Sequence, residues 1–470
     1  MLQGWLASTL AIRTDDPATA AAVSYLRQDL TLLKEEHTSF KQVPFWIQTG
    51  EWMHLPRAYG LTPDGRWMSD AWGMQVMDSR TPPCLLPTGC SVAGIQWGVP
   101  PFPSGQAQFI RDMADGARST GVGGLAIAPT RSGKTLCSLQ AACDLGFCTL
   151  ILVDSDSLRR QWRRDIEAHV RDANGNSVSV GIIQQDKFEV DHPFVIAMVQ
   201  TLANRQLDSS ARARFGTVIV DECQSAPCDL IMGALVRVEA AYVLGLSATP
   251  DRKDGLGKAI GWLIGPVIAV LEREMHADVL FVPLPFRDVP FPHVSRHGNV
   301  RVRRGTLVRY GKIDRNEVEK AIMHDEEHIS TVANHLWNYH IDGRHVLAFV
   351  GLREHAFRMR GMLQSFGGNP GLYIGGQTNP SEMEKSPCIS TFRAGGKGVD
   401  FRPPPTLLAI CAPISDVRQV CGRGLQPQAP CTPMIMDVVP QHDALVRQAC
   451  RRLEYYRERE FNILNDPWGN

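Results

Sequence analysis

Two series of short apolar runs, alternating with amphipathic helical patterns, constrain the fold of this chain most strongly. Each run is apolar throughout and only a few residues long, which is typical of parallel strands covered by helices on both faces. The pattern predicts an α/β fold with two parallel-sheet domains in tandem and a cleft between them. The first series occupies residues 124–128, 149–153, 194–199, 217–220 and 242–246, and the second occupies 345–350, 371–374, 388–391, 407–412 and 434–438.

The remaining segments differ in composition. Residues 1–95 are rich in Trp and Pro without a long periodic pattern, which predicts a small mixed α+β domain with a helix near residues 18–35. We expect the first sheet domain at 96–270 and the second at 326–470, the latter ending in a charged helix. The Pro- and Arg-rich segment between them, 271–325, is typical of a linker or a basic insertion.

Composition excludes several classes of protein. No apolar run is long enough to cross a bilayer, and the first residues lack the basic region of a secretory signal. The 12 cysteines show no repeated metal-site spacing, so we expect reduced, mostly buried thiols in a cytoplasmic protein.

Charge is balanced over the whole chain but not locally. Lys plus Arg equal Asp plus Glu at 49 each, so the net charge does not indicate a nucleic-acid partner. Between Val289 and Gly311, however, there is no acidic residue. Two interpretations of this stretch stay open, namely a solvated basic loop and a contact with a phosphate backbone. Its arginines are Arg296, Arg301, Arg303, Arg304 and Arg309, of which we assign Arg301, Arg303 and Arg304 to nucleic acid.

The sharpest local motif is APTRSGKT at residues 128–135, which follows a predicted strand and precedes a helical pattern. It is a P-loop with Ala128 in the place of the first Gly. Lys134 would reach the β- and γ-phosphates of ATP, and the Thr135 hydroxyl would bind Mg²⁺. Backbone amides of the loop and of the helix N-terminus would surround phosphate oxygens, and we assign this contact to Thr130, Ser132 and Gly133.

A second motif, VIVDECQ at residues 218–224, places two acids at the end of an apolar strand. Asp221 would hold Mg²⁺, directly or through water, and Glu222 would orient the attacking water. An Asp–Glu pair after a strand is usually a solvated loop. Here it follows a strand of the sheet that carries the P-loop, which favours the catalytic interpretation.

Two further assignments complete the first domain. Ser247 and Thr249, in GLSATPDR at another strand end, can bond the acidic loop and relay its state. Gln106 lies ahead of the P-loop, where its amide could bind the adenine edge.

These segments resemble those of superfamily-two helicases in order and spacing: APTRSGKT, VIVDECQS, GLSATPDRKDGL, STFRAGGKGVDF and QVCGRGL. The third of them resembles the branch that contains the transcription-repair helicase XPB and helicases of phages and large DNA viruses. HLPRAYGL, GLREHAFRM and GLYIGG further resemble the phage and poxvirus members. The resemblance covers about residues 50–460 and implies two RecA-like domains, ATP hydrolysis and a nucleic-acid partner, DNA more than RNA.

The resemblance also implies roles for residues of the second domain. Gly398 and Asp400 would lie in a loop that contacts both nucleotide and strand. Gln419 and Arg423 would reach toward the γ-phosphate, and Arg353 would contact nucleic acid. In the first domain, Ser247 and Thr249 would couple hydrolysis to movement.

The sequence departs from the family pattern at several motif positions. Arg131 stands where the P-loop usually has Gly, Gln224 where His or Asp is usual, and Lys397 where an acid is common. Gln426 stands where the family has a second arginine. An arginine finger is worth about 10³–10⁵ in rate, and Gln426 cannot supply a positive charge. Three alternatives stay open: Arg423 suffices, another arginine substitutes, or hydrolysis is slow.

Three hypotheses for function follow. The first is an ATP-dependent DNA helicase or translocase of phage or viral replication, recombination or repair, acting in the host cytoplasm. The second is a hydrolysis-impaired scaffold that binds nucleic acid, and the third is a translocase for transcript release. Protein partners would come from replication, recombination or transcription. For Arg57, in HLPRAYG, a DNA contact and a plain surface position stay equally open.

Overall fold

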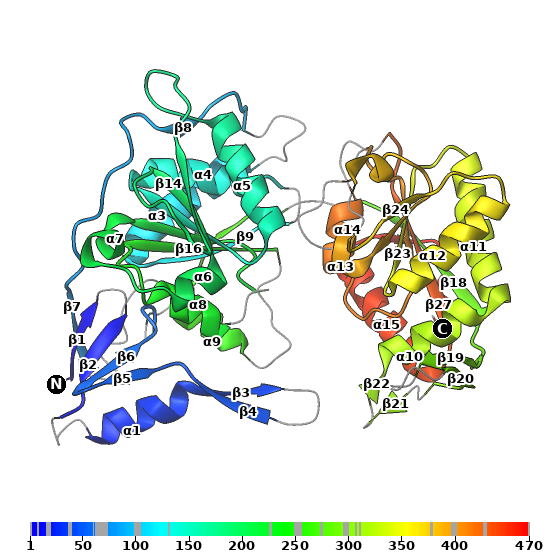
Figure 1. Cartoon of the computed structure of the whole chain (residues 1–470), viewed down its shortest axis with the longest axis horizontal. Helices are drawn as coiled ribbons and strands as arrows, with labels where there is room; N and C mark the ends of the chain where they lie inside the picture. Colours follow the sequence, from blue (N-terminus) through cyan, green and yellow to red (C-terminus); the bar gives the residue numbers. More distant parts are fainter. Residues whose placement is uncertain are drawn as a thin grey trace. The chain divides into compact units, whose positions relative to one another are not determined.

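The structure is a computed structural model with two compact units, Met1–Arg273 and Glu274–Asn470, which are described in turn (Figure 1). The described residues are 2–6, 9–15, 20–35, 40–59, 61, 74–97, 105–129, 132–224, 228–248, 256–272, 276–294, 300–305, 308–309, 312–376, 379–395, 401, 403–425 and 430–468.

The first unit contains an eight-stranded sheet with the strand order β13-β12-β14-β10-β15-β16-β9-β17. Neighbouring strands are parallel, except that β13 is antiparallel to β12. The five strands predicted for this domain are confirmed to within one residue at each end. The bounds are β9 (Gly123–Ile127), β10 (Thr149–Val153), β12 (Val180–Gln184), β13 (Lys187–Phe188), β14 (Phe194–Met198), β15 (Thr217–Val220), β16 (Tyr242–Ser247) and β17 (Val267–Val270).

Helices cover both faces of this sheet because its strands are apolar on both sides. Along β10, Ile151 belongs to the core on one face, and Leu150 and Leu152 belong to the core on the other. The first face is covered by α3 (Gln106–Thr120), α4 (Lys134–Leu145) and α5 (Asp156–His169). The opposite face is covered by α6 (Val199–Asn204), α8 (Cys228–Leu235) and α9 (Gly257–Ile264). The short α7 (Ser209–Arg214) precedes β15, and β8 (Ser91–Val92) pairs with β11 (Val170–Arg171).

The described residues between 2 and 78 form an N-terminal module of mixed α+β structure, drawn in blue in Figure 1. A five-stranded sheet has the order β5-β6-β2-β1-β7, and β3 pairs with β4 in a hairpin. The predicted helix at 18–35 is too long, because the segment after Asp29 pairs with β4 as a strand. The elements are β1 (Leu2–Leu6), β2 (Leu10–Arg13), α1 (Ala20–Asp29), β3 (Thr31–Glu35), β4 (Phe40–Pro44), β5 (Ile47–Thr49), β6 (Trp52–Leu55) and β7 (Met74–Asp78).

The module shares its core with the eight-stranded sheet. Its buried side chains, among them Phe45 and Tyr59, belong to the same apolar cluster as those of α9. Both aromatic rings meet Trp262 edge-on, at centroid distances of 6.1 Å and 5.7 Å. The N-terminal module is therefore an integral part of the first unit.

The second unit contains a seven-stranded parallel sheet with the order β24-β25-β23-β26-β27-β18-β28. Its strands are β18 (Asp278–Pro285), β23 (Val346–Val350), β24 (Gly371–Tyr373), β25 (Cys388–Thr391), β26 (Leu407–Ile410), β27 (Met434–Gln441) and β28 (Asn462–Ile463). The two faces pack against different helices: α11 (Glu326–Ile341) and α12 (Arg353–Ser365) on one, and α14 (Arg418–Gly424) and α15 (Asp443–Glu458) on the other. The helices α10 (Arg315–His324) and α13 (Phe392–Gly395) and the 3-10 helix η2 (Pro380–Met383) complete the described helices of this unit.

The segment 271–325 differs from the expected linker. Its strand β18 lies inside the second sheet, between β27 and β28, so the second unit begins near Glu274. Two prolines, Pro283 and Pro285, lie in the part of β18 beyond its short pairing with β28, where a missing backbone N–H is tolerated. The basic stretch then forms an antiparallel hairpin of β19 (Phe291–Val294) and β20 (Val300–Arg303), followed by the short β21 (Val308–Arg309) and β22 (Lys312–Ile313).

Within the described part of the chain, every helix is either too short or too polar to cross a membrane.

Candidate nucleotide-binding site

The P-loop connects β9 to α4, as its sequence predicted. Gly133 has φ 82°, a left-handed conformation that glycine adopts without a steric penalty. No side chain among the described residues caps the N-terminus of α4, so its first amides keep the positive end that binds anions. Ser132 is buried, and its hydroxyl donates to the carbonyl of Pro129 at 2.7 Å. Thr130 and Arg131 lie outside the described residues.

Lys134, the first residue of α4, points toward the acidic motif. Its Nζ lies 3.6 Å from Oε1 of Glu222, and the two side chains are 10% and 16% exposed. No hydrogen-bond acceptor among the described residues satisfies this buried ammonium. Because an unsatisfied buried donor is costly, the arrangement suits an added anionic ligand such as a phosphate.

The acidic pair follows β15 in a tight turn. Asp221 is buried, and its Oδ1 accepts the backbone N–H of Glu222 at 2.9 Å. Glu222 has φ 45°, which is uncommon for a residue with a side chain and is a strained conformation typical of functional sites. Gln224, one of the departures from the family pattern, donates from Nε2 to Oε2 of Glu222 at 2.5 Å. The amide therefore helps to fix the side chain that would orient water.

Burial raises the pKa of Asp221, and the negative charge of Glu222 raises it further. The charge of Lys134 and a hydrogen bond from Trp162 act in the opposite direction. Each oxygen of Asp221 accepts one hydrogen bond and keeps further acceptor capacity. Such oxygen donors, with the Thr135 hydroxyl at the start of α4, fit a hard cation such as Mg²⁺.

Trp162 is a site residue that the sequence did not single out. Its Nε1 donates to Oδ2 of Asp221 at 2.8 Å. Leu158, Trp162 and Ile166 form the buried row of α5, a spacing typical of any helix packed on a sheet. No sequence signal separates Trp162 from an ordinary core residue.

Gln106 contacts the P-loop from α3. Its amide is fully buried, and Nε2 donates to the carbonyl of Ser132 at 2.7 Å. The contact supports the loop backbone, while the assignment to adenine stays a prediction. Ser247 is buried at the end of β16, where its carbonyl accepts the N–H of Ala128 at 3.0 Å. Thr249 lies outside the described residues.

The predicted residues of the second unit are described only in part. Arg353 is exposed at the first position of α12, and Arg301 and Arg304 are exposed in and after β20. Gln419 and Arg423 belong to α14, but their side chains, like that of Arg303, lie outside the described part. Asp400, Gly398, Lys397 and Gln426 also lie outside it. Their roles stay predictions.

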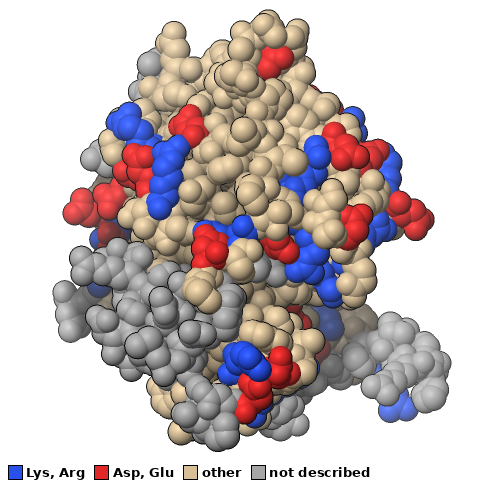
Figure 2. Space-filling model, turned by 90° about the vertical axis from the view of Figure 1, so that its left-hand side faces the viewer, with Lys and Arg blue, Asp and Glu red and all other residues tan. Residues whose placement is uncertain are grey.

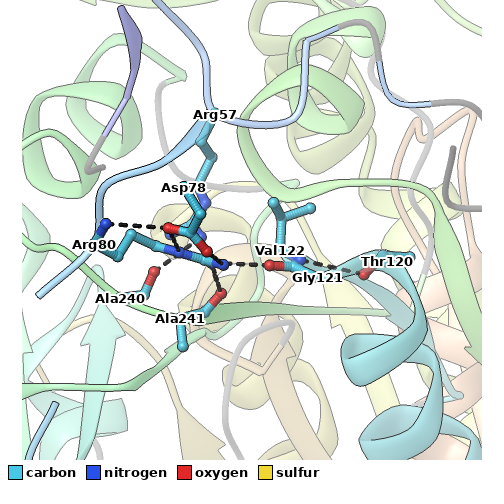
Figure 3. Close-up of polar contacts among 8 residues, drawn as sticks. All are labelled: Arg57, Asp78, Arg80, Thr120, Gly121, Val122, Ala240 and Ala241. Carbon is cyan, nitrogen blue, oxygen red and sulfur yellow. Dashed lines mark hydrogen bonds and ion pairs between the residues drawn. The ribbon is translucent and has the colours of Figure 1, made fainter. Parts of the chain in front are cut away.

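Arg57 has neither of its expected positions. It is only 2% exposed, and its guanidinium donates to the carbonyls of Ala240 and Ala241 at 2.9 Å and 3.1 Å (Figure 3). Arg80, which pairs with Asp78, donates to Ala241 and to Gly121 at 2.6 Å and 2.8 Å. These carbonyls precede β16 and β9, so the two arginines fasten the N-terminal module to the sheet. Burial excludes Arg57 from both a DNA contact and the surface.

Comparison with known proteins finds relatives over the part of the chain that contains this site. The family model described as "Type III restriction enzyme, res subunit" matches residues 101–252, which contain the P-loop and the acidic motif. A protein of Acanthamoeba polyphaga mimivirus named "Putative ATP-dependent RNA helicase" is 24% identical over 89% of this chain and 77% of its own length.

Other relatives match shorter segments. The "Probable helicase" of Escherichia phage T5 is 36% identical over 26% of each chain. The "DNA 3'-5' helicase XPB" of Mycobacterium tuberculosis is 28% identical over 31% of this chain and 27% of its own length. The chain thus spans about a quarter of the length of these two relatives. Among solved structures, bacteriophage T4 UvsW aligns over 98% of both chains with 13% identity and a TM-score of 0.40.

A P-loop strand, an acidic strand end and a third motif strand lie side by side in the parallel part of one sheet, and the relatives described above are named as helicases. The chain is therefore similar to the superfamily-two helicases, which are ATP-dependent motors, and among them to members of the XPB-like branch.

Proposed function

We propose that this chain couples ATP hydrolysis to strand separation, branch migration or remodelling of nucleic acid, DNA more than RNA. The proposed setting is phage or viral DNA replication, recombination or repair in the host cytoplasm. The observation that carries the proposal is the buried Lys134–Glu222 pair beside Asp221, at the P-loop end of the sheet.

Each residue of this group has a proposed task in the first unit. Lys134 binds the β- and γ-phosphate oxygens, Thr135 and Asp221 hold Mg²⁺, and Glu222 orients the attacking water. The magnesium ion, when bound, neutralises phosphate charge and aligns the β- and γ-oxygens. Gln224 keeps Glu222 in place through the bond to Oε2.

The second unit supplies the other proposed contacts. Gln419 and Arg423 act on the γ-phosphate, and Asp400 takes part in nucleotide binding. Arg353 and the hairpin arginines Arg301, Arg303 and Arg304 bind the phosphate backbone of nucleic acid. Support for the hairpin comes from the exposure of Arg301 and Arg304 on an antiparallel ribbon without acidic residues.

The described surface of the first unit differs from this hairpin in its distribution of charge. Figure 2 shows one face of the molecule, on which basic and acidic side chains lie next to one another. In the N-terminal module, for example, Arg13 pairs with Asp15 at 2.6 Å and with Glu51 at 3.2 Å. Such intermixed charge does not favour a phosphate backbone, which supports the hairpin as the better candidate.

The type of nucleic acid is open to direct test. The mimivirus relative is named an RNA helicase, whereas a Halobacterium salinarum relative is named "Putative DNA 3'-5' helicase". We therefore propose to measure the steady-state ATPase rate of the full chain with single-stranded DNA, duplex DNA, forked DNA and RNA. The proposal expects the largest stimulation with a DNA ligand.

The same panel separates the alternatives. ATP binding without turnover on any ligand would favour the hydrolysis-impaired scaffold and contradict the motor. Stimulation by duplex DNA without strand displacement, combined with release of transcripts from a stalled polymerase, would favour the transcript-release translocase.

A further inference from the structure

From outside the acidic motif, the buried side chain of Trp162 donates a hydrogen bond to Asp221. It is fully buried on α5, which follows β10 and is capped by Ser155, whose hydroxyl accepts the N–H of Leu158. A tryptophan N–H is a donor only, and burial leaves it no water to bond. The Trp162–Asp221 bond is therefore a fixed part of the folded first unit.

The bond completes the support of the Asp221 carboxylate. Oδ2 accepts from Trp162 at 2.8 Å, and Oδ1 accepts from the backbone of Glu222 at 2.9 Å. With one donor on each oxygen, the carboxylate group cannot rotate without losing a buried hydrogen bond. The remaining lone pairs consequently keep one orientation.

We propose that Trp162 is a positioning residue for the magnesium ligand of this motor. Its indole N–H holds the Asp221 carboxylate in the orientation that receives the metal, so magnesium affinity depends on where α5 sits. The inference rests on the proposed function, since it takes Asp221 as the metal ligand. Hydrogen-bond partners of metal ligands typically change metal affinity or activity by about 10- to 100-fold.

Trp162→Phe removes the N–H and keeps most of the apolar volume. The matched control is Trp262→Phe in the same unit, because Trp262 packs against Phe45 and Tyr59 instead of a carboxylate. In the full-length protein, binding of fluorescent ADP would be measured first in EDTA and then over a magnesium titration. ATPase would be measured over the same titration.

We expect Trp162→Phe to bind ADP in EDTA as the wild type does. The magnesium concentration at half-saturation should rise about tenfold, and ATPase should recover partly at high magnesium. The Trp262→Phe titration should overlay the wild-type curve. Recovery at high magnesium is the result that a merely structural defect would not give.

Two outcomes would overturn the proposal: an unchanged magnesium midpoint in Trp162→Phe, or an equal shift in Trp262→Phe. If Trp162→Phe does not fold, 3-benzothienylalanine at position 162 replaces the N–H by sulfur in a ring system of the same shape. The magnesium midpoint of that variant is then compared with those of the wild type and Trp262→Phe. A wild-type protein whose nucleotide binding and turnover do not respond to magnesium would instead contradict the proposed function itself.

Discussion

The described polar residues of the nucleotide site in the first unit are buried or half-buried, whereas the described arginines proposed for nucleic acid in the second unit are exposed. Lys134 lies 3.6 Å from Glu222, and Asp221 lies 2.8 Å from Trp162. Arg301 and Arg353, by contrast, are exposed on a hairpin and at a helix end. Arg57 belongs to the buried group despite its basic side chain. The comparison teaches that burial, and not charge alone, separates residues that organise the protein from residues available to a large ligand.

The largest effect tests the buried site. Glu222→Gln removes the carboxylate that orients water and keeps the side-chain shape, so turnover should fall by about 10²–10⁴ while ATP binding persists. Glu239→Gln is a matched control, since Glu239 is also mostly buried and lies 3.5 Å from Arg212. Equal loss of ATPase in both variants would show that the effect is not specific to the site.

The next effect tests whether Arg57 is structural. Arg57→Ala removes two hydrogen bonds from a charged donor to Ala240 and Ala241, so the first unit should lose about 2–4 kcal/mol of stability. Thermal unfolding and limited proteolysis would measure this loss. The stability of Arg57→Lys should lie between those of the wild type and Arg57→Ala. A stable Arg57→Ala protein with weakened DNA binding would reverse our assignment.

A pH effect extends the comparison to the second unit. Burial, followed by the charge of His355, lowers the pKa of His328 to about 4, against an ordinary value of 6.5, while Asp325 opposes this and Arg287 adds to it. Because the unfolded chain binds the proton more readily, His328 contributes stability above about pH 6.5 that is lost as pH falls toward 4.

The loss should reach up to about 3 kcal/mol. In His328→Gln, the free energy of unfolding should fall less between pH 7 and pH 4 than in the wild type. Urea unfolding of the second unit at each pH would measure this difference. An identical pH profile in the variant would mean that other groups control acid stability.

The smallest effect tests the exposed group. Replacing Arg301, Arg303 and Arg304 by Ala should leave stability nearly unchanged. The slope of the logarithm of the DNA-binding constant against the logarithm of salt concentration should become shallower by about 0.7–0.9 per lost phosphate contact. Replacing Arg447 and Arg451, which are exposed on α15, serves as the control. An unchanged salt slope would remove the hairpin from the nucleic-acid contacts.

The sequence predicted the sheets and the P-loop because those features depend on short-range patterns. Runs such as residues 149–153 are apolar on both faces and only a few residues long, which is typical of a parallel strand covered on both faces. Strand β18 was missed because its prolines suggest a linker, although pairing with β27 leaves them at a tolerated position. The strand's place is set by contacts with residues more than a hundred positions away.

The supporting contacts of the site could not be predicted. Trp162 occupies an ordinary core position in the helical pattern, and only the fold brings its N–H to Asp221. Similarly, Arg57 lies in a segment that suggests a ligand contact, yet it donates to the backbone carbonyls of Ala240 and Ala241. Such long-range polar pairs leave no periodic signal in one sequence.

The central claim is that Lys134 binds the phosphates of an ATP whose hydrolysis nucleic acid stimulates. The most direct measurement is phosphate release by Lys134→Ala with and without DNA, beside the exposed control Lys187→Ala. We predict that Lys134→Ala loses DNA-stimulated release, to below about 1% of the wild-type rate, while Lys187→Ala keeps it. Wild-type turnover in Lys134→Ala would contradict the account.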